Sequence, residues 1–282
     1  MNIQRALITA ASPSQRTLPL QSLIDRDGVR KTALATILDE VTAAGIEEVG
    51  VVICPGDQPA YEAAAGAHAA RLRFIEQPSP LGYGHAVRCG RSFTDNAPFL
   101  LLVADHLYVS AADRGCAAQL LEVAAAEACA VSAVQPTHES KIIRYGTVGG
   151  RLVVGRPGLY EIEDLMEKPT PTEAEQHLIV PGLRAGHFLC FFGMHVLTPT
   201  VMEILEDLLR AESDPRRVPL TQALRVLAER ERYLAAELQG RRFDIAEKYG
   251  LLTAQLALAL EGADRAEVLA GLVELLASGR AR

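Results

Sequence analysis

Cysteine is scarce and irregularly placed in this sequence. The 282 residues contain five cysteines, none of them in a C-x-x-C pair: Cys54, Cys89, Cys116, Cys129 and Cys190. An odd, scattered set of this kind excludes a disulfide framework and a zinc site of the usual spacing. We therefore expect a protein that works in a reducing compartment, the cytoplasm of a bacterial-type cell.

Long apolar runs and clusters of basic residues are also missing. No apolar stretch reaches the roughly 18 residues that span a membrane, and the first residues show no signal-peptide pattern. Lys and Arg number 28 against 35 Asp and Glu, a formal net charge of −7. This balance argues against nucleic acid and membrane as partners. With 49% hydrophobic and 22% charged residues, the composition is that of a globular protein with a full core.

Glycine is absent where a phosphate-binding loop would normally carry it. Residues 7–19 read LITAASPSQRTLP: a short apolar strand, two alanines, and a loop at 12–15 that ends at Arg16. The first loop of a nucleotide-binding α/β protein is commonly rich in glycine, because phosphate comes close to the backbone there. Whether this loop still holds a triphosphate is therefore the question that the sequence raises.

Apolar runs alternate with helical patterns through the first half. The expected elements are strands at 6–9, 49–54, 72–76 and 99–103 and helices at 33–44, 61–70 and 85–90. This order predicts an α/β fold with a mostly parallel sheet flanked by helices. Ligands of such sheets bind at the carboxyl ends of the strands, so we expect residues 10–16, 77–85 and 104–106 to line one crevice.

The second half has a more mixed pattern. The expected elements are strands at 130–135, 147–154, 188–195 and 234–238 and helices at 199–210 and 220–231. We expect a turn at Gly149-Gly150 and an amphipathic helical tail at 251–277 with a break near Gly262. Because no repeat or linker is visible, the sequence predicts a single domain over residues 1–282.

Two lone aspartates follow strands of the predicted sheet. Asp105 ends the most apolar strand, and Asp244 follows a short strand in GRRFDIAEKYG. A carboxylate at such a place is costly unless it faces solvent, a partner or a metal, and capping a turn is the alternative role. Two carboxylates at strand ends can hold one Mg²⁺ that also binds substrate phosphates, but spacing alone does not show that these two meet.

Two further motifs combine polar side chains with turns. In EQPSPLGYGHAVRCG (76–90), Gln77 offers the donor and acceptor that a pyrimidine edge requires, and Gly82 lets a ring approach the backbone; an ordinary turn is the alternative. In DLMEKPTP (164–171), Glu167 suits sugar hydroxyls and Lys168 suits a phosphate; an exposed charge pair is the alternative. Pro169 is expected to hold Lys168 in an extended conformation.

Taken in order, several stretches resemble one family. They are ALITAASPSQRTLP, VTAAGIEEV, EQPSPLGYGHAV, FLLLVADHL, RYGTVGG, LMEKPTP, AGHFLCFFGMHVL, PLTQALRVLAE and FDIAEKYG. From the first strand to about residue 255, the chain resembles the sugar-nucleotide pyrophosphorylases, above all the bacterial UTP–glucose-1-phosphate uridylyltransferases. The resemblance implies a Rossmann-like nucleotidyltransferase fold with a nucleotide-binding half at 1–135, a sugar-binding half at 136–250 and a helical tail at 251–282.

The same resemblance implies a reaction and its partners. A sugar 1-phosphate attacks the α-phosphorus of UTP in the presence of Mg²⁺, which yields UDP-glucose and pyrophosphate. The expected partners are UTP or a UDP-sugar, glucose 1-phosphate or a related sugar phosphate, and further copies of the chain in a homo-oligomer. In such transfers the protein contributes mainly positioning and electrostatic stabilisation.

Roles follow from the resemblance residue by residue. The matched residues are Ala10, Ala11 and Arg16 for the triphosphate, Gln77 and Gly82 for the uracil, Asp105 and Asp244 for the metal, Gly146, Glu167 and Gly186 for the sugar, Lys168 for the sugar phosphate, and Lys248 as a second basic residue beside Asp244. The expected catalytic groups are Arg16, Lys168 and the two aspartates.

The sequence departs from the family in its phosphate-binding segments. The family loop reads G-x-G-T-R, where residues 12–16 read SPSQR, and serines at the glycine positions must strain or reshape the loop. Within 21–31 no lysine stands at the position of a triphosphate-binding lysine of the family, and Arg26, Arg30 and Lys31 are the alternatives for its role. His106 replaces an acid or a small residue. Two alternatives stay open: a weak or inactive relative that binds a sugar nucleotide as a sensor or subunit, and an enzyme for another nucleotide and sugar phosphate.

Overall fold

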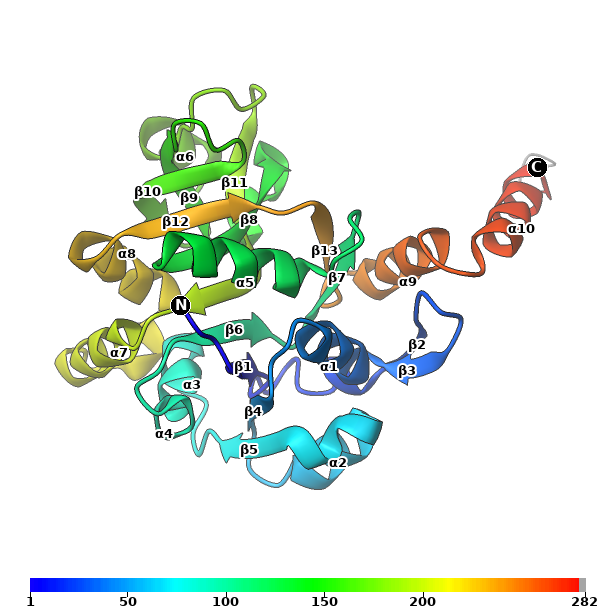
Figure 1. Ribbon diagram of the computed structural model, residues 1–282, viewed down its shortest axis with the longest axis horizontal. Coiled ribbons are helices and arrows are strands. Elements are labelled where there is room, and N and C mark those ends of the chain that lie inside the picture. Colours follow the sequence, from blue (N-terminus) through cyan, green and yellow to red (C-terminus); the bar gives the residue numbers. More distant parts are fainter. Residues whose placement is uncertain (279–282) are drawn as a thin grey trace.

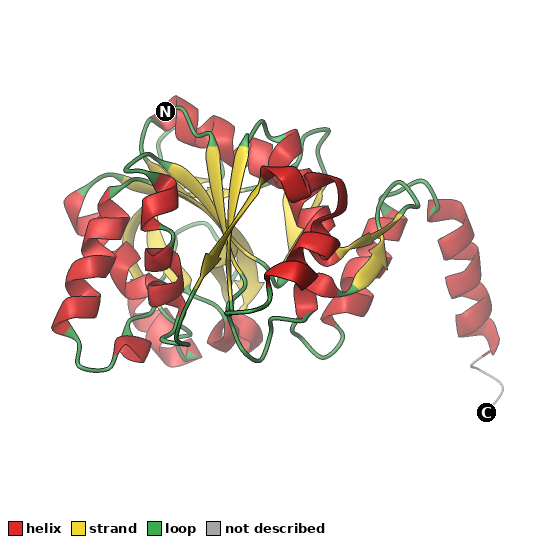
Figure 2. Ribbon diagram, turned by 90° about the horizontal axis from the view of Figure 1, so that it is seen from below, coloured by secondary structure: helices red, strands yellow, loops and turns green. Residues whose placement is uncertain are grey.

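The computed structural model describes residues 1–278, which are built around one large sheet with helices on both of its sides (Figure 1, Figure 2). The sheet has nine strands in the order β5-β4-β1-β6-β11-β8-β12-β10-β9. Its strands are β1 (Arg5–Thr9), β4 (Glu48–Ile53), β5 (Leu72–Glu76), β6 (Phe99–Val103), β8 (Ala130–His138), β9 (Thr147–Leu152), β10 (Leu159–Met166), β11 (His187–Leu197) and β12 (Tyr233–Glu237). Outside it stand two two-stranded sheets, β2 (Ser22–Ile24) with β3 (Arg30–Thr32) and β7 (His106–Ser110) with β13 (Gly240–Asp244).

The part of the sheet formed by the first half of the chain is parallel, as the sequence predicts. β1 pairs in parallel with β4 and with β6, and β4 pairs in parallel with β5. The central strand β6 is almost wholly buried, which suits a strand covered by helices on both faces. The carboxyl ends of these strands therefore meet at one edge of the sheet.

The remainder of the sheet is mixed, which corrects the expectation of a mostly parallel sheet. β11 runs antiparallel to β6 and β8, and β10 runs antiparallel to β12 and β9, whereas β12 and β8 are parallel. Because β9 also pairs with β11, the strands β11, β8, β12, β10 and β9 close on themselves. Apolar periodicity identifies strands but carries no information on their direction, so the sequence could not predict this closure.

Gly149 and Gly150 lie inside strand β9 and do not form the expected turn. A Cβ on Gly150 would lie 2.0 Å from the carbonyl oxygen of Glu161, and a Cβ on Gly149 would lie 2.7 Å from Cα of Leu178. The neighbouring backbones thus leave no room for side chains at this point of the closed part of the sheet. Here a glycine pair marks the close approach of another backbone.

Helices cover both faces of the sheet. They are α1 (Ala33–Ala43), α2 (Gln58–Ala65), α3 (Tyr83–Cys89), α4 (Arg91–Thr94), α5 (Cys116–Glu127), α6 (Pro171–His177), α7 (Thr200–Ala211), α8 (Leu220–Arg230), α9 (Gly250–Leu260) and α10 (Arg265–Ser278). Short 3-10 turns are η1 (Leu18–Leu20), η2 (Gly66–Arg71), η3 (Glu139–Arg144) and η4 (Pro215–Arg217). None of the described helices is both long enough and apolar enough to cross a bilayer.

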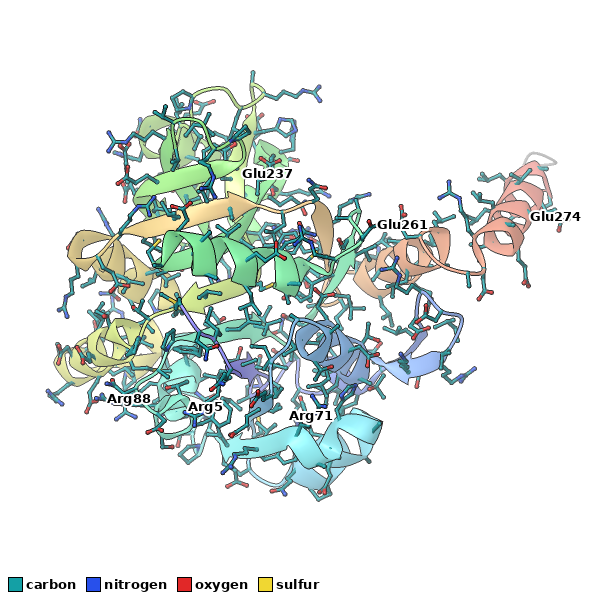
Figure 3. The ribbon with its side chains drawn as sticks, in the orientation of Figure 1. Arg5, Arg71, Arg88, Glu237, Glu261 and Glu274 are labelled. Atoms are coloured by element: carbon teal, nitrogen blue, oxygen red, sulfur yellow. The ribbon has the colours of Figure 1, made fainter. Side chains whose placement is uncertain are left out.

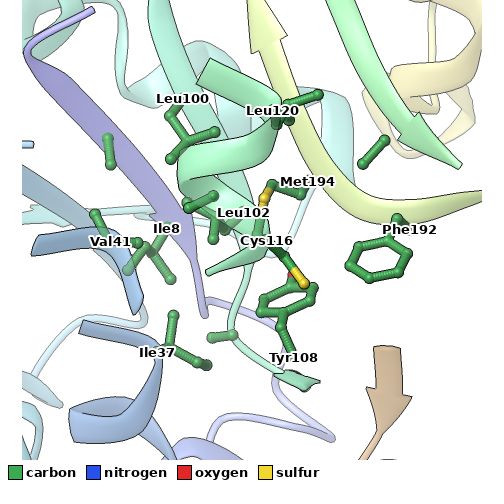
Figure 4. Packing of buried hydrophobic residues seen from close by; sticks show 14 of the residues in the cluster. Ile8, Ile37, Val41, Leu100, Leu102, Tyr108, Cys116, Leu120, Phe192 and Met194 are labelled. Atoms are coloured by element: carbon green, nitrogen blue, oxygen red, sulfur yellow. The ribbon is translucent and has the colours of Figure 1, made fainter. Parts of the chain in front are cut away.

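The core lies between the sheet and its helices. On one face, Ile8 of β1 and Leu102 of β6 pack with Ile37 of α1 and with Leu120 of α5, all fully buried (Figure 4). Helix α1 begins after Thr32, whose hydroxyl oxygen accepts the N–H of Ala35 at 3.0 Å. Burying a leucine or isoleucine contributes about 1.5–3 kcal/mol each, so this face fixes the edge of the sheet that carries the site.

The C-terminal tail divides where the sequence predicts a break. α9 ends at Leu260 and α10 begins at Arg265. The side chain of Gln255 in α9 makes two hydrogen bonds of 2.8 Å with the backbone of Ile24, whereas α10 has no buried residue and projects from the body (Figure 1, and Figure 3 with Glu274 labelled). Residues 279–282 of the predicted tail lie outside the described residues.

Candidate active site

Asp105 and Asp244 are brought together by the small β7–β13 ribbon. Asp105 lies in the two-residue turn between β6 and β7, and β7 pairs with β13 so that Asp244 lies opposite His106. The N–H of Ile245 donates to the carbonyl oxygen of Asp105 at 2.8 Å, which ties the two backbone segments together. One ligand atom each of Asp105, His106 and Asp244 lies within 4.8 Å of the others. The two carboxylates, far apart in sequence, thus belong to one cluster.

Burial and charge act differently on these two carboxyl groups. Burial alone would raise the pKa of Asp105, but the His106 ring donates from Nδ1 to Oδ1 at 2.8 Å, and this hydrogen bond and charge lower the pKa overall. Burial raises the pKa of Asp244; His106 opposes that effect and the charge of Asp105 adds to it. The pair therefore holds negative charge that the chain only partly compensates. Two such carboxylates are a donor set that fits a hard divalent cation.

The cluster opens into a cavity of about 710 Å³. This volume lies within the range of small-molecule and cofactor sites. The cavity is formed where β1, β5 and β6 end, as the rule for open α/β sheets predicts. It is lined by eight of the candidate residues: Ala10, Ala11, Gln77, Gly82, Asp105, Glu167, Lys168 and Asp244.

One wall of the cavity is the turn before α3. Gln77 is buried, and its side-chain N–H groups donate to the carbonyl oxygen of Gly82 at 3.1 Å and to Nδ1 of His85 at 2.9 Å. Burial and the charge of Arg88 lower the pKa of His85, so its neutral ring can accept this bond. Gly82 has φ +91, a conformation that side chains rarely adopt. The Gln77 amide therefore shapes the turn as well as facing the cavity.

The opposite wall carries Glu167 and Lys168. The hydroxyl of Thr221, in the first turn of α8, donates to Oε2 of Glu167, and the Nζ of Lys168 lies 3.7 Å from Oε1 of the same carboxylate. Lys168 has φ +49, so it is not extended as the following Pro169 predicts. Its N–H donates to the carbonyl oxygen of Tyr145 at 3.2 Å, and this bond accompanies the left-handed turn that follows β10. The side chain of Lys168 is 58% exposed.

The loop after β1 is reshaped rather than strained. The N–H groups of Gln15 and Arg16 donate to the carbonyl oxygen of Ser12 at 3.0 and 2.8 Å, so the loop folds as a tight turn. Neither Ser12 nor Ser14 is among the described residues with positive φ. Pro13 has no N–H to offer, and the amides of Gln15 and Arg16 already have partners within the loop.

Four candidate residues do not line the cavity: Arg16, Gly146, Gly186 and Lys248. Arg16 pairs instead with Asp57, with Nη1 3.2 Å from Oδ1. A Cβ on Gly146 would lie 2.6 Å from the Phe191 ring, so this glycine supports the wall that carries Glu167. Lys248 is exposed, with Nζ 5.2 Å from the centre of the Tyr249 ring.

Several lining residues were not singled out from the sequence. Tyr83 opens α3, and burial raises the pKa of its hydroxyl, which therefore stays protonated. Tyr145 donates to Oε1 of Glu247 at 2.8 Å, and Arg144 pairs with the same oxygen at 2.8 Å. The stretches LGYGHAV and RYGTVGG contained three of these residues, but nothing in their spacing showed that Arg144 and Tyr145 meet Glu247.

Residues 28–258 match the family described as Nucleotidyl transferase. The chain belongs to that family. The matched span begins after the loop at 12–16 and includes both metal-candidate aspartates, Glu167 and Lys168. The departure of this nucleotidyl transferase at 12–16 therefore lies before the matched span, whereas the departure at His106 lies within it.

Relatives of this nucleotidyl transferase extend over nearly the whole chain. A UTP–glucose-1-phosphate uridylyltransferase of Bacillus subtilis is 27% identical over 97% of this chain and 96% of its own length. One of Streptococcus pneumoniae is 26% identical over 92% of this chain and 91% of its own. These likenesses confirm the resemblance that the sequence motifs indicate.

Solved structures have the same fold. A UDP-glucose pyrophosphorylase complexed with UDP-glucose superposes with a TM-score of 0.75 at 22% identity, over 91% of this chain and 98% of that one. A UTP-bound UDP-glucose pyrophosphorylase from Acinetobacter baumannii superposes with a TM-score of 0.73 at 21% identity, over 96% of this chain and 99% of that one. The α/β nucleotidyltransferase fold expected from the sequence is thereby confirmed.

Proposed function

We propose that this nucleotidyl transferase forms UDP-glucose and pyrophosphate from UTP and glucose 1-phosphate with Mg²⁺. A phosphate oxygen of glucose 1-phosphate attacks the α-phosphorus of UTP, the bond from that phosphorus to the bridging oxygen breaks, and pyrophosphate leaves. The observation that carries the proposal is a single cavity that holds the carboxylate cluster, the Gln77 turn and the Glu167–Lys168 wall together. Uridylyltransferases among its relatives support the choice of substrates.

The lining residues divide into subsites. We assign the base to Gln77 and the backbone at Gly82, and the sugar hydroxyls to Glu167, with Gly146 shaping the wall behind it. Gly186 is assigned to the sugar by the resemblance to the family alone, and a Cβ there would lie 3.6 Å from Oε2 of Glu139. Lys168 suits the sugar phosphate, because its ammonium group is exposed and close to Glu167. In this proposal residues 1–135 supply the nucleotide subsite and residues 136–250 the sugar subsite.

Binding a triphosphate requires positive charge beside its phosphates, and the chain places few cationic side chains there. We propose that Asp105 and Asp244 hold Mg²⁺, which supplies charge neutralisation for the phosphates and their developing negative charge. The backbone at Ala10 and Ala11 lines the cavity beside them. Arg16 would have to leave Asp57 to reach the triphosphate, and Lys248 would have to turn inward.

One observation favours a second candidate function. The loop at 12–16 uses two of its N–H groups internally and Arg16 is paired with Asp57, so the triphosphate part of the site is weaker than the sugar part. A relative that binds the sugar nucleotide as a sensor or subunit fits this imbalance. The cluster of Asp105 with Asp244 supports the enzyme instead, because binding a finished sugar nucleotide does not require it.

Pyrophosphate release with a panel of triphosphates and sugar 1-phosphates tests the proposal. The purified chain should release pyrophosphate fastest with UTP and glucose 1-phosphate, and only when Mg²⁺ is present. Faster release with another pair would move the assignment to another nucleotide or sugar. No release with any pair, together with binding of UDP-glucose, would establish the sensor.

The setting of the protein is also a proposal. We infer a cytoplasmic location, supported by five thiols, none of which is paired among the described residues.

We further propose a homo-oligomer, supported by the exposed apolar side chains of α10, such as Leu269, Val273 and Leu276. Light scattering coupled to size-exclusion chromatography measures the assembly, and a monomeric mass would contradict it.

A further inference from the structure

His106 occupies a place that the two-aspartate site does not explain. Its ring contributes one of the three ligand atoms that lie within 4.8 Å of one another, together with Asp105 and Asp244. The residue is 9% exposed and lines the cavity, and it is the only histidine among the described residues that does so.

The spacing of two of these side chains is that of neighbouring ligands in one coordination shell, and the ligand atoms of all three lie within 4.8 Å of one another. Ligands about 2.1 Å from an octahedral cation lie about 3 Å apart when they are adjacent and about 4.2 Å apart when they are opposite. Nδ1 of His106 and Oδ1 of Asp105 lie 2.8 Å apart, close to the spacing of adjacent ligands, and a cation bound between them would replace their hydrogen bond, with Nδ1 deprotonated. Asp244 lies opposite His106 in the ribbon, and Asp105 directly precedes β7, so the three side chains are held close together by one pair of strands.

The ring is held in position by its surroundings. Gly193 of β11 has φ +82, and a Cβ there would lie 3.3 Å from Cδ2 of His106 and 2.9 Å from Cγ2 of Val103. The hydroxyl of Tyr108 donates to the carbonyl oxygen of Gly193 at 2.9 Å, which fixes β11 over the ribbon. Since the ring needs no large movement to present a nitrogen, the ligand is preorganised.

We propose that His106 is a third ligand of the divalent cation and that its nitrogen shifts the metal preference of the site toward Co²⁺ relative to Mg²⁺. This inference rests on the proposed function only in placing a cation at Asp105 and Asp244. Mg²⁺ takes oxygen ligands and keeps several waters, whereas an imidazole nitrogen suits the later divalent metals of the first transition row. A ligand set of two carboxylate oxygens and one imidazole nitrogen therefore discriminates against Mg²⁺ more than two carboxylates alone do.

Pulsed electron paramagnetic resonance of bound Mn²⁺ tests the ligand without turnover. The full chain, prepared once with ordinary histidine and once with ¹⁵N-histidine, is loaded with Mn²⁺ alone and again with Mn²⁺ and UTP. We expect ¹⁴N modulation of the Mn²⁺ echo that changes to the ¹⁵N pattern on labelling. Absence of nitrogen modulation in both states, whether or not Mn²⁺ binds, would overturn the proposal.

Competition calorimetry measures the preference. In His106→Ala and His106→Gln, the ratio of the Mg²⁺ and Co²⁺ dissociation constants should fall at least about tenfold, as expected for loss of a direct ligand. His177→Gln, which changes an exposed histidine on α6, should leave the ratio unchanged. Nitrogen coupling without pyrophosphate release would refute the proposed enzyme activity and support His106 as a ligand. Pyrophosphate release without nitrogen coupling would support the activity and refute His106 as a ligand.

Discussion

At the scale of single residues, the site depends on a few charges held at fixed points. Asp105 is the clearest of them, because it comes just after a strand of which four of five residues are buried and lies close to both His106 and Asp244. A carboxylate at such a position is retained only where something positive offsets its burial. The function of Asp105 therefore depends on the positively charged group or cation that it binds.

Asp105→Asn is expected to abolish Mg²⁺-dependent pyrophosphate release while the protein stays folded. The amide keeps the shape and removes the charge, and loss of one preorganised electrostatic contact typically costs about 10²–10³ in rate. Steady-state assays and circular dichroism on the purified variant measure both effects. Asp113→Asn, which changes an exposed aspartate beyond the β7 strand, serves as the control and should retain the full rate. An unchanged rate in Asp105→Asn would remove this residue from the metal site.

A second residue-scale prediction concerns stability in acid. His195 is 3% exposed, with Nδ1 2.5 Å from the Ser132 hydroxyl, and burial lowers its pKa from 6.5 to about 3. As the pH falls, the unfolded chain therefore binds a proton at His195 before the folded chain does. The free energy of unfolding that this group contributes above pH 6.5 is lost as the pH falls toward 3. The loss attributable to one such proton is about 1.4 kcal/mol per pH unit.

Replacing His195 by Phe should reduce this dependence by about one proton, whatever its effect on absolute stability. Urea unfolding at several pH values between 6.5 and 4 gives the slope of the unfolding free energy against pH. His177→Gln alters an exposed histidine and should leave the slope as it is. An identical slope in His195→Phe and in the parent chain would show that His195 is not held neutral.

At the scale of elements, the sequence predicted some parts of the site and missed others for physical reasons. The strands that end at Thr9 and Val103 were predictable, because buried parallel strands are continuous apolar runs. The β7–β13 ribbon was not, since its pairing joins segments far apart in the chain and periodicity does not identify partners. Lys168 was expected to be extended from its proline neighbour, but tertiary hydrogen bonding to Tyr145 accompanies a left-handed conformation.

The loop after β1 gives the prediction at this scale. Its tight turn and Pro13 leave few N–H groups for phosphate, whereas the Gln77 and Glu167 walls are intact. UDP-glucose should therefore bind more tightly than UTP in the same Mg²⁺ buffer, as measured by calorimetry. The double change Ser12→Gly and Ser14→Gly, with a lysine restored within 21–31, should raise turnover with UTP. Tighter binding of UTP than of UDP-glucose by the parent chain would contradict this account of the serines.

At the scale of the whole molecule, the two C-terminal helices differ in what they contribute. α9 buries Ala254 and Leu258 and bonds to the β2 strand through Gln255, so it closes the side of the molecule beside β13. α10 places its apolar side chains, among them Val273 and Leu276, in contact with solvent. Because burial of apolar surface supplies most of the stabilising free energy, only α9 is expected to matter to the folded monomer.

At concentrations low enough to keep the chain monomeric, removal of residues 265–282 should therefore change the melting temperature by less than about 2 °C, because it uncovers little apolar surface of the monomer. A second truncation, of residues 250–282, removes the buried side chains of α9 and its two hydrogen bonds, and should lower the melting temperature by well over that amount. Thermal unfolding followed by circular dichroism compares both with the full chain at equal concentration. A large loss in the shorter truncation would mean that α10 is covered in solution, by another copy of the chain, and that its exposed side chains belong to an interface.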